Sequence, residues 1–153
     1  MFTGTAASYQ ETLIQNDGFW PDIDAGAFER RRSTPAAQDD ERIAYAVANA
    51  MASVNLELER LKARYMAEGI VKAADIEAFP AINGKNRVVI QYEAAVFARA
   101  KADLLPDFVT VHQKKDGDHL AERSLETKNE LLAESVRILR NMLGHNRSTV
   151  DLL

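Results

Sequence analysis

The sequence predicts an all-α fold: a helical bundle with two long helices plus supporting helices, a flexible N-terminal arm and an extended C-terminal tail. Apolar side chains recur at steps of three or four residues from Ile43 to Tyr65, which is the period of an α-helix. A second stripe with the same period runs from Leu125 to Leu143. The composition agrees, because 46% apolar and 27% charged residues are normal for a soluble globular protein.

The length of 153 residues suits one domain with an extension at each end. We place the helical bundle domain at residues 19–144. Residues 1–18 are polar and mixed, which is typical of a flexible arm that orders on binding. Residues 145–153 form the C-terminal tail. No apolar run reaches the roughly 20 residues that span a bilayer, so the sequence predicts no membrane partner.

A short first helix is predicted over about residues 22–32. Pro21 suits the start of a helix, where its missing N–H breaks no hydrogen bond. Ile23 and Phe28 are the expected core contacts of this helix. Pro35 ends it, because the residue before a proline is driven out of helical geometry.

The second helix is the longest predicted element, from about Pro35 to Gly69, with Ser33 or Thr34 as its N-cap. Its apolar stripe is continuous, and its opposite face carries charged side chains. At about 1.5 Å of rise per residue, about 33 residues would form a single rod of roughly 50 Å. We expect such a rod to span the body and to protrude from it.

The second half of the chain is predicted to contain two further helices. Residues 70–86 are a connector, because proline, asparagine and glycine gather there. The third helix runs from about residue 85 to 105 and stops at Pro106. Residues 107–118 are expected to form a loop or a weak strand. The fourth helix covers about residues 118–143.

The side chains that could support catalysis or metal binding all have a simpler interpretation. His112, His119 and His145 lie in or beside predicted loops, and none has a second ligand at helical spacing. The acid pair Asp22 and Asp24 lies in a first helical turn, where the helix dipole favours carboxylates. No nucleophile elbow, phosphate loop or dinucleotide fingerprint is present. We therefore predict no enzymatic activity, no metal site and no cofactor.

The densest basic run, Arg30 to Arg32, leaves two interpretations open. These side chains either contact phosphate or an acidic partner, or they stabilise the C-terminus of the first helix. The first interpretation supports an alternative function, a small helical regulatory protein that binds nucleic acid. The net charge of −4 argues against broad affinity for DNA, because such affinity depends on neutralising phosphates.

The C-terminal tail begins after Gly144, a residue type that commonly follows the last turn of a helix. It carries three large apolar side chains, Val150, Leu152 and Leu153. Such side chains are not stable when they are all exposed to water. They must fold back on their own body or insert into a partner, and we favour the partner.

The order of several sequence landmarks resembles the GPL family of head-completion proteins of contractile-tailed phages. The resemblance covers residue 19 to the end of the chain, and the closing segment is its most family-like piece. The segment 106–110 departs from the more polar segment of the family. The matching pieces are Phe19-x-Pro21-x-Ile23-Asp24 followed by Phe28, Val54-Asn55, Gly69, Tyr92 with Ala95-Val96 and Ala100, and Arg147-x-Thr149-Val150-Asp151-Leu152.

This resemblance implies a structural virion protein at the head–tail interface, present in the host cytoplasm during assembly. Such proteins join the portal vertex after DNA packaging, hold the genome in and present a surface for the tail. Related connectors are helical bundles arranged as a ring, commonly twelvefold, beneath the portal. The implied partners are the portal protein, neighbouring copies of the chain and a tail-side terminator or completion protein. Packaged DNA would pass through the ring without specific binding.

The resemblance also implies where the chain contacts the portal, because the C-terminal segment of such proteins typically reaches up to it. The expected site is therefore the docking tail. Its residues are Arg147, Thr149, Val150, Leu152 and Leu153.

Overall fold

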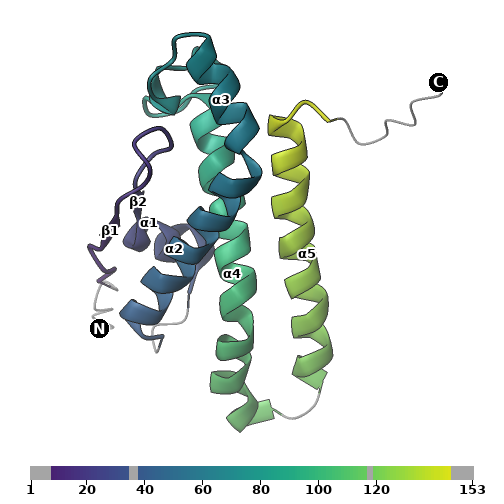
Figure 1. The fold of residues 1–153 in the computed structure, drawn as a ribbon. Helices are drawn as coiled ribbons and strands as arrows, with labels where there is room; N and C mark the ends of the chain where they lie inside the picture. The colour runs from purple at the N-terminus through teal and green to yellow at the C-terminus, as the bar shows by residue number, and fades with distance from the viewer. Residues whose placement is uncertain (1–7, 35–37, 117–118, 146–153) are drawn as a thin grey trace, which may run out of the picture.

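The computed structural model describes residues 8–34, 38–116 and 119–145, with the side chains of 108–126 excepted. In these residues the predicted predominance of helix is confirmed, with the addition of one small sheet (Figure 1). The elements in chain order are β1 (Leu13–Ile14), β2 (Ile23–Asp24), α1 (Ala25–Arg32), α2 (Asp40–Glu57), α3 (Glu59–Ala67), a 3₁₀ turn η1 (Ala73–Asp75), α4 (Arg87–Asp116) and α5 (His119–Met142).

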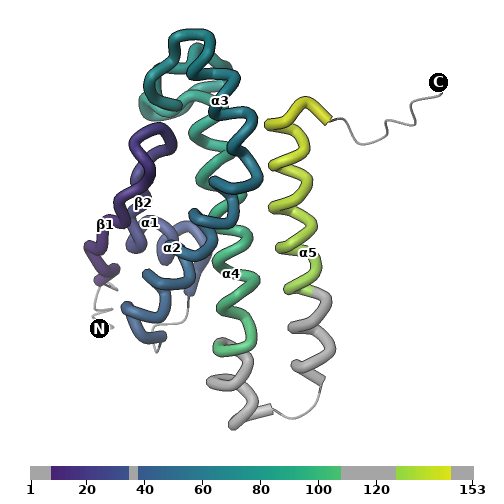
Figure 2. The backbone as a smooth tube through the Cα atoms, viewed as in Figure 1, coloured from purple at the N-terminus to yellow at the C-terminus, as the bar shows by residue number. Residues whose placement is uncertain are grey.

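Helix α4 is the central element of the fold. Figure 1 shows α2 crossing one side of α4 and α5 running along the other. Figure 2 traces the same path and places the β1–β2 segment beside α1 and α2, on the flank away from α5. Helix α4 has buried residues on several of its sides, because it contacts several neighbouring elements. The buried residues include Val89, Tyr92, Val96, Phe97 and Leu104.

The N-terminal segment differs from the flexible arm that we expected over residues 1–18. Residues 8–18 lie against the body, and β1 pairs antiparallel with β2 through Leu13 opposite Asp24 and Ile14 opposite Ile23. This pairing was not predictable, because two-residue strands leave no measurable periodicity in a sequence. Residues 1–7 lie outside the described part of the chain.

Helix α1 begins later than predicted. Asp24 is the N-cap, and its Oδ1 accepts a hydrogen bond of 2.9 Å from the backbone N–H of Gly26. Ile23 therefore lies in β2 rather than in a helix, but it and Phe28 are both buried, as expected for core contacts. The helix ends at Ser33, which adopts left-handed geometry with φ of 51°.

The expected single rod from residue 35 to 69 is interrupted at Leu58, whose φ of −96° and ψ of 7° separate α2 from α3. The N–H of Leu58 still donates to the carbonyl of Val54 over 3.0 Å, so the chain bends rather than stops. The bend keeps Val54, Leu58 and Leu61 in the core. The N-cap of α2 is Asp39 rather than Ser33 or Thr34.

The prediction that Pro106 ends the third helix is wrong. Helix α4 continues to Asp116, so residues 107–116 are helical rather than a loop or strand. A proline inside a helix removes one hydrogen bond and costs about 3 kcal/mol. Packing offsets this cost, because α4 lies along α5 and both Ala102 and Leu104 are fully buried beside the proline.

Candidate partner-binding surfaces

The predicted docking tail begins at the C-terminal end of α5. Gly144 has φ of 80°, and the N–H of His145 donates to the carbonyl of Arg140 over 2.8 Å. Glycine therefore follows the helix as predicted, in the left-handed geometry that closes a helix C-terminus. The predicted site residues Arg147, Thr149, Val150, Leu152 and Leu153 lie outside the described residues.

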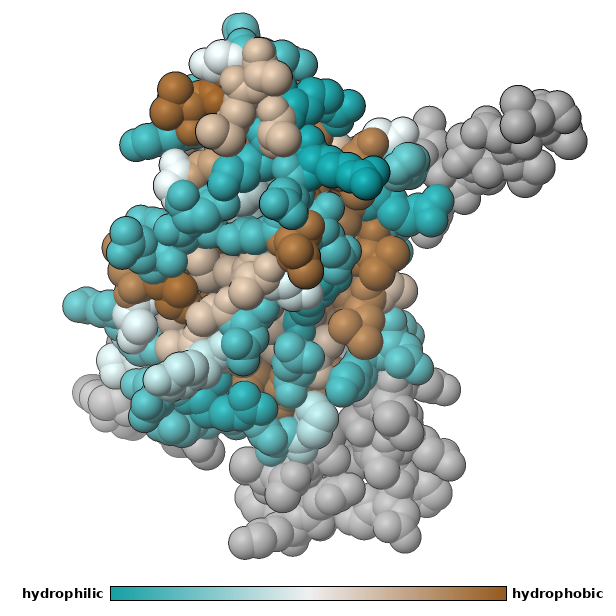
Figure 3. All heavy atoms as spheres, in the orientation of Figure 1, coloured by the Kyte–Doolittle hydropathy of each residue, from teal (hydrophilic) through white to brown (hydrophobic). Residues whose placement is uncertain are grey.

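An apolar loop lies between α3 and α4, and we call it the connector loop (residues 70–86). Val71, Phe79 and Ile82 expose 71%, 70% and 61% of their area. Figures 1 and 3 show this loop at the end of the molecule where α5 also ends, with apolar surface on it. The sequence predicts this segment to be a connector only. The signal for an exposed apolar loop is the large apolar pair Phe79 and Ile82 beside the turn residues Asn83 and Gly84.

Local contacts fix the shape of the connector loop. Ile82 and Lys85 form an antiparallel bridge around a two-residue turn, in which Asn83 and Gly84 have φ of 51° and 78°. The Arg87 guanidinium donates to the carbonyl of Phe79 over 3.0 Å. Positive φ at both central positions is the geometry of a tight hairpin turn that favours Asn-Gly. The exposed apolar side chains are thus held on an ordered support.

The outer face of α5 is basic. A shallow depression of about 240 Å³ is lined there by Val136, Arg137, Arg140 and His145, among others. A neighbouring hollow of about 180 Å³ brings Arg60 and Arg64 of α3 to the same end of α5. Arg137 and Arg140 have no ion-pair partner among the residues that the structure describes.

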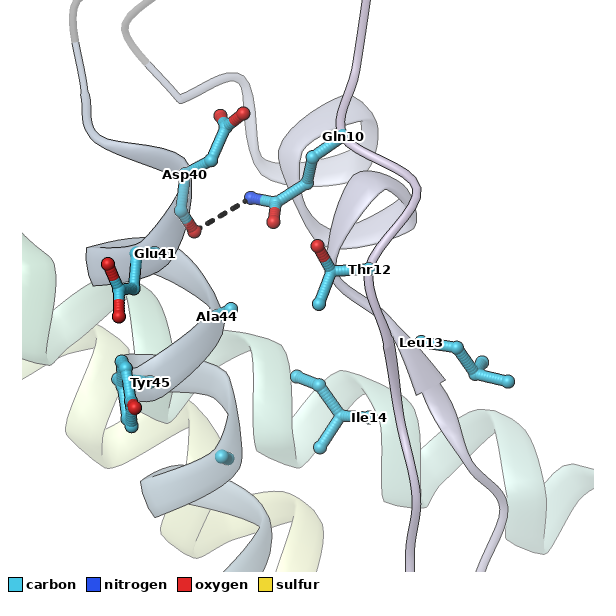
Figure 4. Close-up of a pocket in the computed structure, with 9 residues that line it drawn as sticks. Gln10, Thr12, Leu13, Ile14, Asp40, Glu41, Ala44 and Tyr45 are labelled. Atoms are coloured by element: carbon cyan, nitrogen blue, oxygen red, sulfur yellow. Dashed lines mark hydrogen bonds between the residues drawn. The ribbon is translucent and has the colours of Figure 1, made fainter.

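A groove of about 560 Å³ lies between the N-terminal segment and the start of α2 (Figure 4). Its walls are mainly apolar, and the carboxylates of Asp40 and Glu41 stand at one end. Leu13 on β1 and Tyr45 on α2 expose 67% and 62% of their area. We call this surface the β1–α2 groove.

The described residues offer little for chemistry. Among the side chains that the structure describes, in residues 8–34, 38–107 and 127–145, no three His, Asp or Glu groups are placed to hold a metal ion together. Asp22 and Asp24 have structural roles, since Asp22 accepts from the N–H of Asn16 over 2.7 Å and Asp24 caps α1. No helix in this part of the chain is both long and apolar enough to cross a bilayer.

Residues 14–153 match the family model described as phage head completion protein (GPL). The chain belongs to the GPL family. The resemblance noted from the landmarks is thereby confirmed, and the protein is a structural, virion-associated phage protein rather than an enzyme.

Two curated proteins show the same relationship over most of their length. The chain is 35% identical over 158 residues to a probable head completion/stabilization protein of Haemophilus phage HP1 (strain HP1c1), with both chains fully covered. It is 32% identical over 141 residues to the head completion/stabilization protein of Escherichia phage P2, covering 92% of this chain and 83% of that one. No solved structure matches the chain.

Two of the landmarks of this GPL-family chain meet in one hydrogen-bond cluster. The Tyr92 hydroxyl donates to Asn55 Oδ1 over 2.6 Å and accepts from Asn16 Nδ2 over 2.8 Å. Asn55 Nδ2 donates back to Asn16 Oδ1 over 2.8 Å, which closes the ring of contacts. Burial raises the pKa of the Tyr92 hydroxyl above its usual range. The landmarks therefore hold the N-terminal segment, α2 and α4 together.

The basic run of α1 is paired with acidic groups of the body, although the side chains of Arg30 and Arg31 remain exposed. Arg31 contacts Glu93 at 2.7 Å and lies over the ring of Phe97, and Arg32 forms a two-point contact with Glu134 of α5. Arg31 and Arg32 are therefore paired with carboxylates of the same chain. These pairings remove the main support for the nucleic-acid-binding alternative.

Proposed function

We propose that this protein completes and stabilises the DNA-filled head by binding as a ring beneath the portal, where it forms the head–tail connector. Membership of the GPL family supports the role in the head. The ring, commonly twelvefold among related connectors, and the portal contact extend that role. The net charge of −4 supports a channel through which DNA passes without specific binding.

The observation that carries the portal contact is the position of two features at one end of the molecule. The tail leaves α5 at Gly144 and His145, and the connector loop with Phe79 and Ile82 lies at the same end (Figure 1). Exposed apolar side chains on an ordered support are typical of partner contacts. This end therefore faces the portal, and the opposite end faces the tail-side terminator or completion protein.

In this arrangement the tail residues Val150, Leu152 and Leu153 insert into the portal, with Arg147 and Thr149 as polar contacts. The apolar side chains would supply most of the affinity, because each buried Leu or Val contributes about 1.5–3 kcal/mol. A segment that orders on binding loses conformational entropy, which lowers the affinity of each copy. A ring of copies offsets this loss through avidity.

The test is binding of the full chain to the portal of its own phage, compared with a chain that ends at His145. We expect the shortened chain to lose portal binding and to keep the helical circular dichroism and thermal midpoint of the full chain. The matched control carries the tail with Ser148→Ala, which removes one hydroxyl and should bind normally. Full binding by the shortened chain would refute the role of the tail.

A second variant separates the tail from the connector loop. Phe79→Ser and Ile82→Ser replace exposed side chains and should leave stability nearly unchanged. We expect weaker portal binding with the tail intact. If only the shortened chain loses portal binding, the contact belongs to the tail alone. If the shortened chain and the loop variant both bind normally, the proposed orientation is refuted.

A further inference from the structure

Two oppositely charged surfaces lie on opposite flanks of the molecule. Figure 1 shows β1 and the start of α2 on one flank and α5 on the other, with α4 between them. The first flank carries the β1–α2 groove with its carboxylates. The second carries the basic outer face of α5. Surfaces on opposite flanks are the arrangement that head-to-tail association requires.

The outer face of α5 has the features of a surface that could insert into a groove on another molecule. Val136 exposes 47% of its area on this face, with Arg137 and Arg140 beside it. Helix positions three and four residues apart lie on one side of a helix, so Val136 and Arg140 point the same way. Residues Leu131, Ser135 and Leu139 are buried on the opposite side against α4 and leave this face unused by the core.

The β1–α2 groove has the features of a surface that could accept such a helix face. Ile14 on β1 points toward Ala44 of α2, whose small side chain leaves room for another, and Tyr45 is exposed beside it (Figure 4). The carboxylates of Asp40 and Glu41 are exposed at one end of the groove and have no ion-pair partner among the described residues. The groove thus combines an apolar floor with an acidic end.

We propose that the occupant of the β1–α2 groove is the outer face of α5 from a second copy of this chain. Val136 would enter the groove between Ile14 and Ala44, beside Tyr45, and Arg137 and Arg140 would pair with Asp40 and Glu41. Opposite charges at complementary positions fix the register of such a contact and exclude the like-charged pairings of a symmetric dimer. Because the two surfaces differ, each copy uses both, and such head-to-tail association forms a ring when the rotation between neighbouring copies closes.

This inference deepens the proposed function and rests on it, since it names the contact between neighbouring copies in the ring. Each contact adds modest affinity, and closure of the ring makes all contacts mutually supporting. A chain held at the portal by its tail would therefore be aligned for lateral contact by its flanks.

The experiment uses assembled phage particles and the absence of cysteine from the sequence. A chain with both Tyr45→Cys and Val136→Cys is supplied during assembly, and purified particles are treated with a bismaleimide cross-linker. We expect a ladder of covalent multimers of this chain on a denaturing gel. The matched controls are the two single-cysteine chains, which should give monomers.

The outcomes separate the inference from the proposed function. Particles that contain the double-cysteine chain without a ladder would overturn the inference and leave the head-completion role intact. Dimers from Val136→Cys alone would also overturn it, because they indicate a symmetric contact between α5 helices. Absence of the wild-type chain from finished particles would instead refute the proposed function.

Charge reversal provides a second measurement that does not depend on cross-linker geometry. Arg137→Glu with Arg140→Glu, or Asp40→Lys with Glu41→Lys, should each lower incorporation of the chain into particles about tenfold, because like charges then face each other. Combining the four substitutions in one chain should restore incorporation, since complementarity returns. Failure of the combined variant to recover, with its thermal midpoint intact, would overturn the proposed pairing.

Discussion

The hydroxyl of Tyr92 donates a hydrogen bond of 2.6 Å to Asn55 Oδ1, which joins the N-terminal part of α4 to α2. The ring of Tyr92 stacks on Trp20, with 4.9 Å between centroids and 4° between planes. One buried side chain thus makes polar contacts at its tip and aromatic contacts along its face. It holds residues 16–20 in place, because it contacts both Asn16 and Trp20.

Replacing Tyr92 with Phe should keep the stacked ring and remove the hydroxyl alone. Asn16 and Asn55 would each lose a partner in a partly buried site, so we expect a loss of about 1–2 kcal/mol in the free energy of unfolding. Urea denaturation followed by circular dichroism measures this. Tyr45→Phe is the matched control, because Tyr45 is 62% exposed. Equal urea midpoints for Tyr92→Phe and Tyr45→Phe would contradict the role of the hydrogen-bond cluster.

Gly26→Ala should detach the N-terminal segment from α1. A Cβ at this position would lie 2.1 Å from the backbone oxygen of Gln10, so the backbone must move. The hydrogen bond from the Ala25 N–H to the Thr12 carbonyl would be lost with it. We expect faster proteolysis within residues 8–18 and faster amide exchange at Ala25.

The control for this variant is Ala27→Gly, the converse change one residue along α1. It lowers helix propensity by about 1 kcal/mol and creates no contact with the N-terminal segment. The control should therefore weaken α1 while residues 8–18 stay protected. Equal protection of this segment in Gly26→Ala and in the wild-type chain would show that the close approach is not needed for docking.

The pKa of Asp17 predicts a pH dependence of stability. Burial opposes ionisation of this carboxyl, but the Lys62 ammonium and the N–H groups of Trp20 and Phe19 outweigh it and lower the pKa below 3.8. A carboxyl whose pKa is lower in the folded chain contributes stability above its unfolded pKa. That contribution is lost as the pH falls through the folded pKa, so the expected window lies below about pH 4.

Asp17→Asn tests this pH dependence, because asparagine keeps an oxygen that accepts from the two backbone N–H groups and has no charge. We expect the variant to lose stability at pH 7 and to differ less from the wild-type chain at pH 3. Urea midpoints at the two pH values give the comparison. Lys62→Met, which removes the charge that contacts Asp17 at 3.0 Å, should behave similarly. A gap between wild type and Asp17→Asn that widens on acidification would contradict the assignment.

Pro106→Ala should stabilise the protein by about 1–3 kcal/mol, because alanine restores the backbone donor that proline lacks inside α4. Thermal unfolding measures the effect. Ala98→Ser, on the buried side of α4, is a contrasting change that should destabilise the protein. A lower midpoint for Pro106→Ala would show that the bend or ring of the proline is itself needed for packing.

Much of the fold was predictable because a helix records its buried face in the spacing of its apolar residues. The stripe through Val54 and Leu61 and the glycine after α5 were enough to predict long helices and the end of the last one. The buried Ile23 and Phe28 were predictable for the same reason. The tail residues proposed for portal docking stay a prediction, since they lie outside the described part of the chain.

The candidate surfaces were less predictable because sequence does not state whether an apolar residue is covered. Phe79 and Ile82 are of residue types that usually lie in a core, but the Asn-Gly turn beside them holds them in solvent. The pairing of Arg31 with Glu93, 62 positions apart, carries no local signal. Such contacts exist only after distant helices have been brought together.

The sequence by itself determined the helical class, the apolar stripes and the family, because each depends on residue types at local spacing or in order along the chain. The tertiary structure decided the bend at Leu58, the continuation of α4 through Pro106 and the docking of residues 8–18 on α1. The physical reason is common to all three. Local propensity amounts to a few kcal/mol at most, and the packing of neighbouring elements against α4 outweighs it.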